Sequence, residues 1–472
     1  MRNLATIVLG SITGVIHAET HAVLPGGSVQ EKIDVAVDGD IVAIFGGIYN
    51  ENLTITKRIR LVELSGQEVT LGGNLTFSGI ENCPPLEGFT IGSNGDKNII
   101  ISDTTGLVIS EVDHTAGNSI VINGESTVEI KDCSLNNLDP DDGILKISDS
   151  SLSGRVEQGG GIAEMKQIAV GGDVVQESGS LDLFDSTVGG DISTGRDAVK
   201  TVAFRTTVTG DCNWRSNRSW FGYGKARSFN FYGSDAKVVF VGGEIDRLGS
   251  RVVGMNLEGG KNEYTVVNSY IHNVGAYSNY NNESNCIEIS GVDHMVEILN
   301  NYFSTNHAGS SGSQHTIELG NDVKNAKIIG NVFREDHPSS WTKAVFAPFG
   351  VLVEGNLWAG IEADGHDFLV EGGVSLGKNN IRAHHASLFV DGDPYDVAEG
   401  SPAIDAGTED ARYNDRDGTR NNIGPSGGSW YDPEGWTTEK PVVISFDLTP
   451  DQVLEGVNTE VTIDDVRAVS GQ

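Results

Sequence analysis

The five residues Gly154-Arg155-Val156-Glu157-Gln158 recur in related form at three later positions of the chain. They return as Gly172-Asp173-Val174-Val175-Gln176, as Gly190-Asp191-Ile192 and as Gly210-Asp211-Cys212, at steps of 18, 18 and 20 residues. A fixed period of this length is typical of solenoids, whose coils bury an apolar row only by stacking on one another. Short alternating runs between Gly and Asp turns indicate strands. The sequence therefore predicts an all-β fold, a single-stranded parallel β-helix.

Composition fits one long solenoid and excludes several partners. The chain has 472 residues, with 61 glycines and only 12 prolines, which suits many tight turns. Its 32 basic and 66 acidic residues give a net charge of −34. Such a charge repels nucleic-acid phosphates and anionic membrane surfaces. We therefore expect no nucleic-acid partner.

The two ends of the chain are predicted to differ from the solenoid. Arg2 followed by the apolar run 4–16 is typical of a signal peptide, assigned to 1–18, and a buried first strand is the alternative. No later segment is apolar enough to span a membrane. We expect the β-helix over 19–430 in a secreted or cell-surface monomer. Residues 438–472 predict a C-terminal hairpin, or part of an immunoglobulin-like attachment segment.

Two stretches resemble a known family. Asp38-Gly39-Asp40-Ile41-Val42 is similar to the opening of pectin-lyase-like parallel β-helix proteins. The segments 401–408 (Ser-Pro-Ala-Ile-Asp-Ala-Gly-Thr) and 415–424 resemble the stretch that ends many secreted bacterial members of that class. The resemblance implies a right-handed helix and an extracellular location. It does not identify a substrate.

Asparagine recurs at one turn of the longer coils. Asn301, Asn331, Asn356 and Asn380 each precede an apolar residue, at steps of 30, 25 and 24 residues. Amide side chains at one turn of stacked coils can hydrogen-bond to one another in a ladder. We interpret these residues as structural.

Two glutamates are predicted to stack on the outward side of neighbouring coils. Glu288 precedes Asn301 by 13 residues, and Glu318 precedes Asn331 by the same number. Alternation along each strand points both carboxylates outward, one strand apart. Because like charges this close repel, we expect one of them to have a raised pKa or to share a cation.

Cationic and histidine side chains near these glutamates suggest acid–base chemistry on a uronate polysaccharide. In β-elimination a cation neutralises the substrate carboxylate and a base removes the proton at C5. The alternative is that the glutamates and histidines are ordinary solvated residues. The candidate catalytic set is His315, Arg334, Lys343, Glu288 and Glu318, with His294, His307 and His337 nearby.

An aromatic and cationic stretch interrupts the acidic chain between 211 and 232. Sugar rings stack on Trp and Tyr faces, and Arg or Lys pairs with uronate or sulfate groups. The alternative is a loop whose aromatic residues are buried against the helix. The candidate substrate-binding residues are Trp214, Arg215, Arg218, Trp220, Tyr223 and Lys225.

One weak metal signal lies near the end of the predicted helix. Asp415 and Asp417 stand as in a calcium loop, but the position where such a loop places its last Glu is Ser426. A charged turn held by Arg420 is the alternative. Calcium is thus the one cofactor that the sequence suggests.

The four cysteines, Cys83, Cys133, Cys212 and Cys286, lack zinc-type spacing. Three disulfide pairings are open to them in an exported protein. Cys212 occupies the position of Val174 and Ile192 in the repeat, which predicts a core residue.

Three functions remain open from the sequence. The first is an exported polysaccharide lyase acting on acidic, uronate-containing glycans. The second is a noncatalytic surface protein that binds glycans or acts as an adhesin. The third is a purely structural extracellular solenoid.

Overall fold

The computed structural model describes residues 18–64, 66–92, 98–114, 119–248, 253–275, 285–305, 314–323, 325–335, 342–360, 370–437, 442–449 and 462–469. Contacts divide the chain into two compact units, Met1–Ser134 and Leu135–Gln472. Each unit is taken by itself below. The predicted signal peptide at 1–18 falls almost wholly outside the described residues.

The first unit opens with a strand and a short helix. Strand β1 (Thr20–Val23) precedes α1 (Val29–Val35), whose N-terminus is capped by the Ser28 side chain accepting from the Glu31 amide. Val29 and Ile33 are the buried face of the helix. The sequence analysis missed this helix, although Ser28 followed three residues later by Glu31 is a capping-box pattern.

The remaining strands of the first unit are short and parallel. β1 pairs with β2 (Ile41–Ile44), which pairs with β5 (Arg60–Glu63). The other strands of this unit are β3 (Gly47–Tyr49), β4 (Leu53–Ile55), β6 (Val69–Leu71), β7 (Leu75–Ser78), β8 (Leu86–Glu87), β9 (Thr90–Ile91), β10 (Ile99–Ser102), β11 (Leu107–Ser110), β12 (Asp113–His114), β13 (Ser119–Asn123) and β14 (Thr127–Lys131). The division between the units falls within β15 (Ser134–Leu135).

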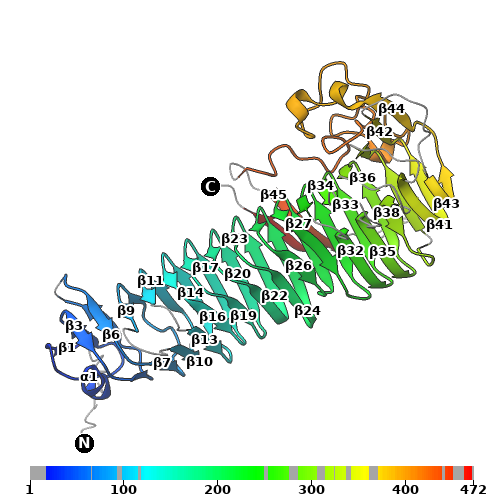
Figure 1. Ribbon diagram of the computed structural model, residues 1–472. Helices are drawn as coiled ribbons and strands as arrows, with labels where there is room; N and C mark the ends of the chain where they lie inside the picture. The colour runs from blue at the N-terminus through cyan, green and yellow to red at the C-terminus, as the bar shows by residue number, and fades with distance from the viewer. Residues whose placement is uncertain are drawn as a thin grey trace, which may run out of the picture. The chain divides into compact units, whose positions relative to one another are not determined.

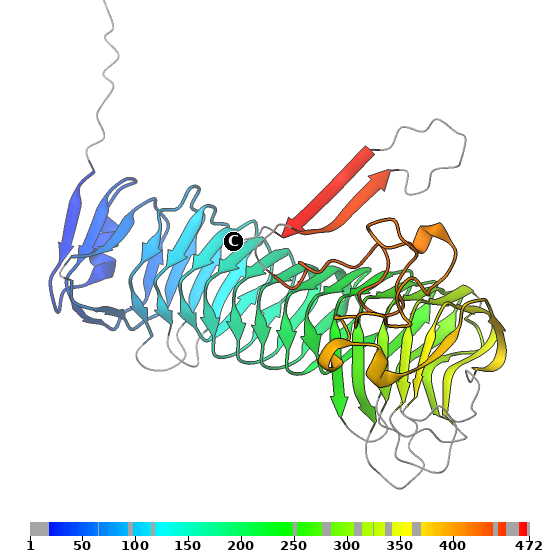
Figure 2. The ribbon, with the colours of Figure 1, turned by 90° about the horizontal axis from the view of Figure 1, so that it is seen from above.

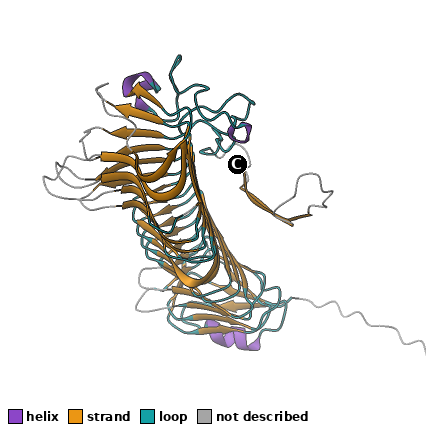
Figure 3. Cartoon of the chain, turned by 90° about the vertical axis from the view of Figure 1, so that its right-hand side faces the viewer, coloured by secondary structure: helices purple, strands orange, loops and turns teal. Residues whose placement is uncertain are grey.

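The second unit is a parallel β-helix of three strand stacks (Figures 1 and 3). Each coil contributes one strand to each stack, and successive coils pair in register. Val156, Val174, Ile192 and Cys212 lie directly over one another, as the repeat predicts. The predicted all-β, right-handed parallel β-helix is confirmed.

The three stacks follow one another along the chain. The first stack contains β16 (Asn137–Pro140), β19 (Val156–Gln158), β26 (Asp211–Trp214), β29 (Ser228–Phe231), β32 (Val253–Gly260), β35 (Asn285–Val292) and β38 (Gln314–Leu319). The second stack contains β17 (Ile144–Ser148), β20 (Ile162–Lys166), β27 (Arg218–Gly222), β30 (Lys237–Val241), β33 (Glu263–Val267), β36 (Met295–Leu299) and β39 (Asn325–Ile329). Four long strands run through the corner from the first stack into the second: β22 (Val174–Phe184), β24 (Ile192–Phe204), β41 (Thr342–Glu354) and β43 (Val370–Leu376).

The third stack forms a separate sheet. Its strands are β18 (Ser151–Leu152), β21 (Ala169–Val170), β23 (Thr187–Val188), β25 (Thr207–Val208), β28 (Lys225–Ala226), β31 (Glu244–Leu248), β34 (Tyr270–Gly275), β37 (Tyr302–Thr305), β40 (Val332–Glu335), β42 (Leu357–Gly360) and β44 (Ile381–His384).

The predicted asparagine ladder is present at the corner between the second and third stacks. The Asn301 amide donates to Asn331 Oδ1 at 3.0 Å, and the Asn331 amide donates to Asn356 Oδ1 at 3.0 Å. Asn356 continues the chain to Asn380 Oδ1 at 3.2 Å. Each Oδ1 also accepts a backbone N–H of the preceding coil, at 2.9 to 3.1 Å. The ladder therefore satisfies both side chains and backbone at a buried turn.

Residues 385–437, here called the C-terminal segment, pack back over the second unit (Figure 2). The segment includes three short 3-10 helices, η1 (His385–Ser387), η2 (Val390–Gly392) and η3 (Ala411–Tyr413). Gly424 N donates to Gly330 O at 2.7 Å, and Asn268 Nδ2 donates to Gly427 O at 2.6 Å. Further along, Arg205 Nη1 donates to Thr437 O at 3.0 Å. The segment thus contacts coils from β40 back to β24.

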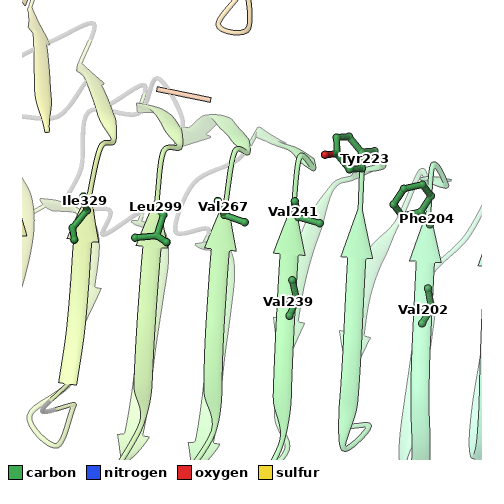
Figure 4. Close-up of a cluster of buried hydrophobic side chains, with 8 residues drawn as sticks. All are labelled: Val202, Phe204, Tyr223, Val239, Val241, Val267, Leu299 and Ile329. Atoms are coloured by element: carbon green, nitrogen blue, oxygen red, sulfur yellow. The ribbon is translucent and has the colours of Figure 1, made fainter. Parts of the chain in front are cut away.

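An apolar stripe lies on the outward side of the second stack (Figure 4). Its residues are nonetheless buried, and Tyr413 of the C-terminal segment packs against them. The C-terminal segment therefore explains why the alternation of these strands departs from apolar-in, polar-out. The stripe consists of Val202, Phe204, Tyr223, Val239, Val241, Val267, Leu299 and Ile329.

The last described strands, β45 (Val442–Thr449) and β46 (Thr462–Val469), form an antiparallel pair, as the predicted hairpin requires. All four cysteines are free and buried, and Cys212 is fully buried at its predicted core position. Among the described residues, no helix has the length and apolar character needed to cross a bilayer.

Candidate active site

Five polar residues form one outward column along the first stack. Strand register places Asn213, Asn230, Asn256, Glu288 and Glu318 on successive strands at one position. Each is preceded and followed by apolar residues, so alternation points the polar side chain away from the core. The predicted pairing of Glu288 with Glu318 is therefore confirmed. The three asparagines were missed, although each stands between two apolar residues as the two glutamates do.

The inward neighbours of the two glutamates fix this orientation. Ile287, Ile289, Ile317 and Leu319 are all fully buried. Glu288 and Glu318 are only partly buried. A one-residue slip would bury both carboxylates, so the apolar pairs specify the register strongly.

His315 and Asn285 hold the Glu318 carboxylate in place. His315 Nδ1 lies 3.3 Å from Glu318 Oε2, and Asn285 Nδ2 donates to the same oxygen at 2.9 Å. His315 is 7% exposed and Asn285 is 4% exposed, so both contacts lie in a shielded part of the face. The arrangement is a carboxylate–histidine pair with a fixed ring orientation.

The pKa of Glu318 is set by its hydrogen bonds to neighbouring residues. The hydrogen bond from His315 lowers the pKa of Glu318, and Asn285 adds to this effect against the opposing effect of burial. Glu318 is therefore not a carboxylate with a raised pKa, and the expectation of a raised pKa at Glu288 or of a shared cation stays a prediction. Glu318 is held as an anion by its own partners, because two donors converge on one of its oxygens.

Lys343 and Phe346 complete the face on the neighbouring strand β41. Lys343 is the Cα partner of His315, and Phe346 is the Cα partner of Glu318. The rings of His315 and Phe346 stack with centroids 4.9 Å apart and planes 25° apart. A cation, a carboxylate–histidine pair and a partly exposed aromatic residue therefore lie on two adjacent strands, β38 and β41. Phe346 was missed, because its strand continues into a long apolar run.

Arg334 does not belong to this face. It lies on β40 in the third stack, where its Nη1 is 3.5 Å from Tyr302 Oη. The Tyr302 hydroxyl in turn lies 2.9 Å from Nε2 of His385 in the C-terminal segment. Sequence proximity to Lys343 suggested one site, but the coil turns a corner between the two residues. Four of the five predicted catalytic residues are therefore brought together and Arg334 is not.

The predicted aromatic patch is not one surface. Trp214 is fully buried, with its ring 5.0 Å from Phe229 and 6.2 Å from Phe221 in the core. Tyr223 is 5% exposed beneath Trp436 of the C-terminal segment, with ring centroids 5.7 Å apart. The assignment of these two residues to sugar stacking is therefore corrected, since neither ring face is accessible.

The other residues of the predicted patch lie on different faces of the coil. Trp220 is partly buried in the second stack, packed against the apolar stripe. Arg218 begins the same strand and is exposed. Arg215 follows β26 at the corner between the first and second stacks, with its guanidinium 5.8 Å from the Tyr232 ring. Only Arg215 is thus close to the first-stack face.

Lys225 lies on the third stack in a cluster of charged residues. Its Nζ is 2.7 Å from Glu244 Oε1 and 3.8 Å from Asp246 Oδ2. His272 Nε2 is 2.9 Å from Glu244 Oε1, and this contact together with Lys225 lowers the pKa of Glu244 to about 2. One ligand atom each from Glu244, Asp246 and His272 lies within 4.8 Å of the others.

This cluster has the donor set of a cation site, yet Lys225 already occupies the place of a cation beside Glu244. The sequence analysis missed it. It could have been found from two similar triplets 26 residues apart, Glu244-Ile245-Asp246 and Tyr270-Ile271-His272. The isoleucine in the middle of each triplet points inward, so the residues on either side point outward.

The predicted calcium loop is organised by backbone hydrogen bonds. Asp415 accepts from the Gly428 amide at 2.5 Å and from the Asn422 amide at 3.2 Å. Asp417 accepts from the Thr419 amide and hydroxyl at 2.9 and 2.7 Å. Arg420 donates to Gly407 O at 2.9 Å. These contacts favour the charged turn over the metal site.

Of the three further histidines, the structure describes only His294, which lies away from the face. His294 is fully buried, where its Nδ1 accepts from the Asn262 amide at 3.2 Å, and burial lowers its pKa. His307 and His337 lie outside the described residues.

Comparisons with known proteins add little to this geometry. No family model matches the chain, and no curated protein resembles it in sequence. One similar solved structure is described as the alginate lyase AlyF-OU02 in complex with G6. It is 14% identical over 78% of this chain and 86% of that chain, with a TM-score of 0.22. A similarity this weak supports no inference about a shared site, so the pectin-lyase-like resemblance of the C-terminal stretch stays a resemblance.

Proposed function

We propose that this protein is an exported carbohydrate-active β-helix protein that cleaves a uronate-containing polysaccharide by β-elimination on the first-stack face. The observation that carries the proposal is the meeting of Lys343, His315 and Glu318 on two adjacent strands. A cation beside a carboxylate–histidine pair supplies the groups of opposite charge that this reaction requires.

Each residue of the face has a distinct part in the proposed reaction. The Lys343 ammonium pairs with the substrate carboxylate and so stabilises the charge that develops beside C5. His315 accepts the C5 proton, and Glu318 orients its ring and stabilises the imidazolium that forms, as a carboxylate does for histidine elsewhere. The C4–O bond breaks, a C4–C5 double bond forms, and the leaving oxygen takes a proton from solvent. Because little of His315 is exposed, the sugar approaches over Phe346.

Glu288 has a supporting part. It lies one strand from Glu318 on the side away from Lys343. Its carboxylate repels a second uronate placed over it, unless a cation lies between the two groups. Calcium is therefore included as a variable in the test below rather than assigned to a site.

A noncatalytic glycan-binding protein is the second candidate function. The Asn230 amide donates to Asn213 Oδ1 at 2.9 Å, so neighbouring asparagines already bond to one another as a polar floor. Such a floor matches sugar hydroxyls and needs no acid or base. Binding without turnover would favour this candidate.

The two functions are separated by one assay. Alginate, pectate and glycosaminoglycans are incubated with the full chain, with calcium and with a chelator, while the absorbance of unsaturated products is followed. We expect turnover of at least one polymer, reduced about 100-fold or more by His315→Gln and by Lys343→Met. Arg334→Gln serves as the matched control, since Arg334 lies on another stack. Equal losses in all three variants, or no product from any polymer, would contradict the proposed lyase.

A further inference from the structure

A second feature of the first-stack face lies three and four strands from Glu318, on β29 and β26. Asp211, at the start of β26, accepts from two arginines: Arg227 Nη2 lies 2.7 Å from Oδ2, and Arg247 Nη1 lies 2.6 Å from Oδ1. Ser228 adds a hydrogen bond of 2.7 Å. Asp191 lies beside this group and accepts from the Asp211 amide at 2.8 Å, so two guanidinium groups and two carboxylates share the corner. Half of the Arg227 side chain is exposed, so its guanidinium edge can also contact a ligand.

The opposite edge of the same two strands carries one more guanidinium group, that of Arg215. Arg215 follows β26 and is exposed, and its guanidinium lies 5.8 Å from the ring of Tyr232, which follows β29 and is 38% exposed. The two edges are separated by the four steps from Asp211 to Arg215. At about 3.3 Å per residue this is roughly 13 Å.

Between the edges lies the polar floor of Asn213 and Asn230. Both asparagines lie on the same outward side of the strands as Asp211. Asn213 is two residues after Asp211, and Asn230 is two residues after Ser228, the strand partner of Asp211. The next strand carries Asn256, whose amide donates to Glu258 at 2.8 Å. Glu258, two residues beyond Asn256 on the same strand, is thus already held by a neighbour.

We infer that β26 and β29 form a binding subsite for the carboxylate groups of an acidic polysaccharide chain. The inference rests on the proposed function, because it takes the same polymer to reach Lys343. Guanidinium groups suit this role because they are always charged and offer more than one edge to a planar carboxylate. The amide floor binds hydroxyls, and Tyr232 offers a ring face beside Arg215.

The distance between the subsite and the catalytic residues defines the substrate. Asn230 and Glu318 are three strands apart, or roughly 14 Å at about 4.8 Å per strand. One sugar cannot touch both. The chain therefore runs parallel to the helix axis, and oligosaccharides long enough to reach β29 bind more tightly than disaccharides.

The test is calorimetric titration of the full chain with uronate oligosaccharides of increasing length. Arg215→Gln and Arg227→Gln are each expected to weaken binding of long acidic oligosaccharides about ten-fold and to reduce its salt dependence. Neither substitution changes the affinity for disaccharides. Arg412→Gln, which removes the same charge from an exposed site in the C-terminal segment, is the matched control.

Further variants distinguish loss of the subsite from misfolding and from failure of the proposed lyase activity. Arg215→Gln leaves no buried partner unpaired, and Asp211→Asn with Arg227→Gln removes both members of the second pair. Wild-type affinity in Arg215→Gln and in this double variant overturns the inference, as does an equal loss for neutral oligosaccharides. Length-dependent binding through both arginines without unsaturated product supports the subsite and contradicts the lyase.

Discussion

The short and the long coils of the second unit have the same three stacks but different surfaces. Between residues 154 and 210 each coil returns after 18 to 20 residues, and outward charges pair between neighbouring coils, as Lys200 does with Asp182 at 2.8 Å. Beyond β32 the coils take 24 to 32 residues. The added residues fall between the third and first stacks, where β34 ends at Gly275 and β35 begins at Asn285. The candidate active site lies beside this corner.

The difference teaches that coil length and polar function are linked. Short coils contact one another through backbone at their corners and leave little room for side chains. At the corner between the second and third stacks, long coils contact one another through the buried ladder from Asn301 to Asn380. Three predictions test this comparison.

The largest effect is expected at a corner of the short coils. Gly179 has a φ of +71°, and a Cβ there would lie 2.2 Å from Gly161 O. Gly179→Val is therefore expected to destabilise the protein by more than about 3 kcal/mol, because backbone strain and a clash with the adjacent coil combine. The midpoint of urea unfolding measures the loss.

Gly418→Ala is the control for this prediction. Gly418 also has a positive φ, of +86°, but nothing lies within 4 Å of its Cβ position. It should lose only the strain contribution, about 1 kcal/mol. Equal losses at both positions would contradict the proposed contact between coil corners.

A smaller effect is expected in the ladder of the long coils. Asn331→Ala leaves the Asn301 amide and backbone N–H without their acceptor in a fully buried turn, and should cost about 2–3 kcal/mol. Asn380→Ala, at the partly exposed end of the ladder, should cost about 1 kcal/mol or less. Thermal unfolding of the two variants gives the comparison, and a larger loss at Asn380 would argue against the ladder as the support of the long coils.

The smallest effect is a pH dependence at the candidate active site. The pKa of Glu318 is lowered in the folded state, so its contribution is present above the ordinary carboxyl range and is lost as pH falls through the folded pKa. Glu318→Gln should cost up to about 1 kcal/mol at neutral pH, since the side chain is partly exposed. The difference from wild type should shrink as the pH falls below 4.5, the ordinary pKa of a glutamate side chain.

Urea unfolding at neutral and acidic pH measures this difference. Glu263→Gln, on an exposed position of β33, is the control and should give a small difference at both pH values. A Glu318→Gln difference that grows on acidification would reverse the sign of the linkage and contradict the His315–Glu318 contact.

Features that repeat locally could be predicted from the sequence. The alignment of Cys212 with Val174, the ladder through Asn331 and the stacking of Glu288 on Glu318 all follow from fixed spacing and two-residue alternation. The same alternation, applied from Cys212, points Trp214 inward. The burial of that ring was thus within reach, but the composition of the stretch 211–232 suggested a surface instead.

Features that depend on chain segments far apart could not be predicted in this way. Arg334 is close to Lys343 in sequence, yet a corner of unrepeated length places it on another sheet beside Tyr302. Tyr223 is covered by Trp436, more than two hundred residues later. No periodicity relates these positions, because the C-terminal segment is not a coil.

The contact between Arg205 and Thr437 spans 232 residues of chain. Synthesis must therefore pass Thr437 before this contact can form, while the coils beneath it can assemble earlier from neighbours in sequence. Until then the apolar stripe of the second stack is exposed to water, which makes the nascent chain prone to aggregation. The C-terminal segment also links the coils from β24 to β44. Coils that would otherwise unfold one at a time are therefore expected to unfold cooperatively.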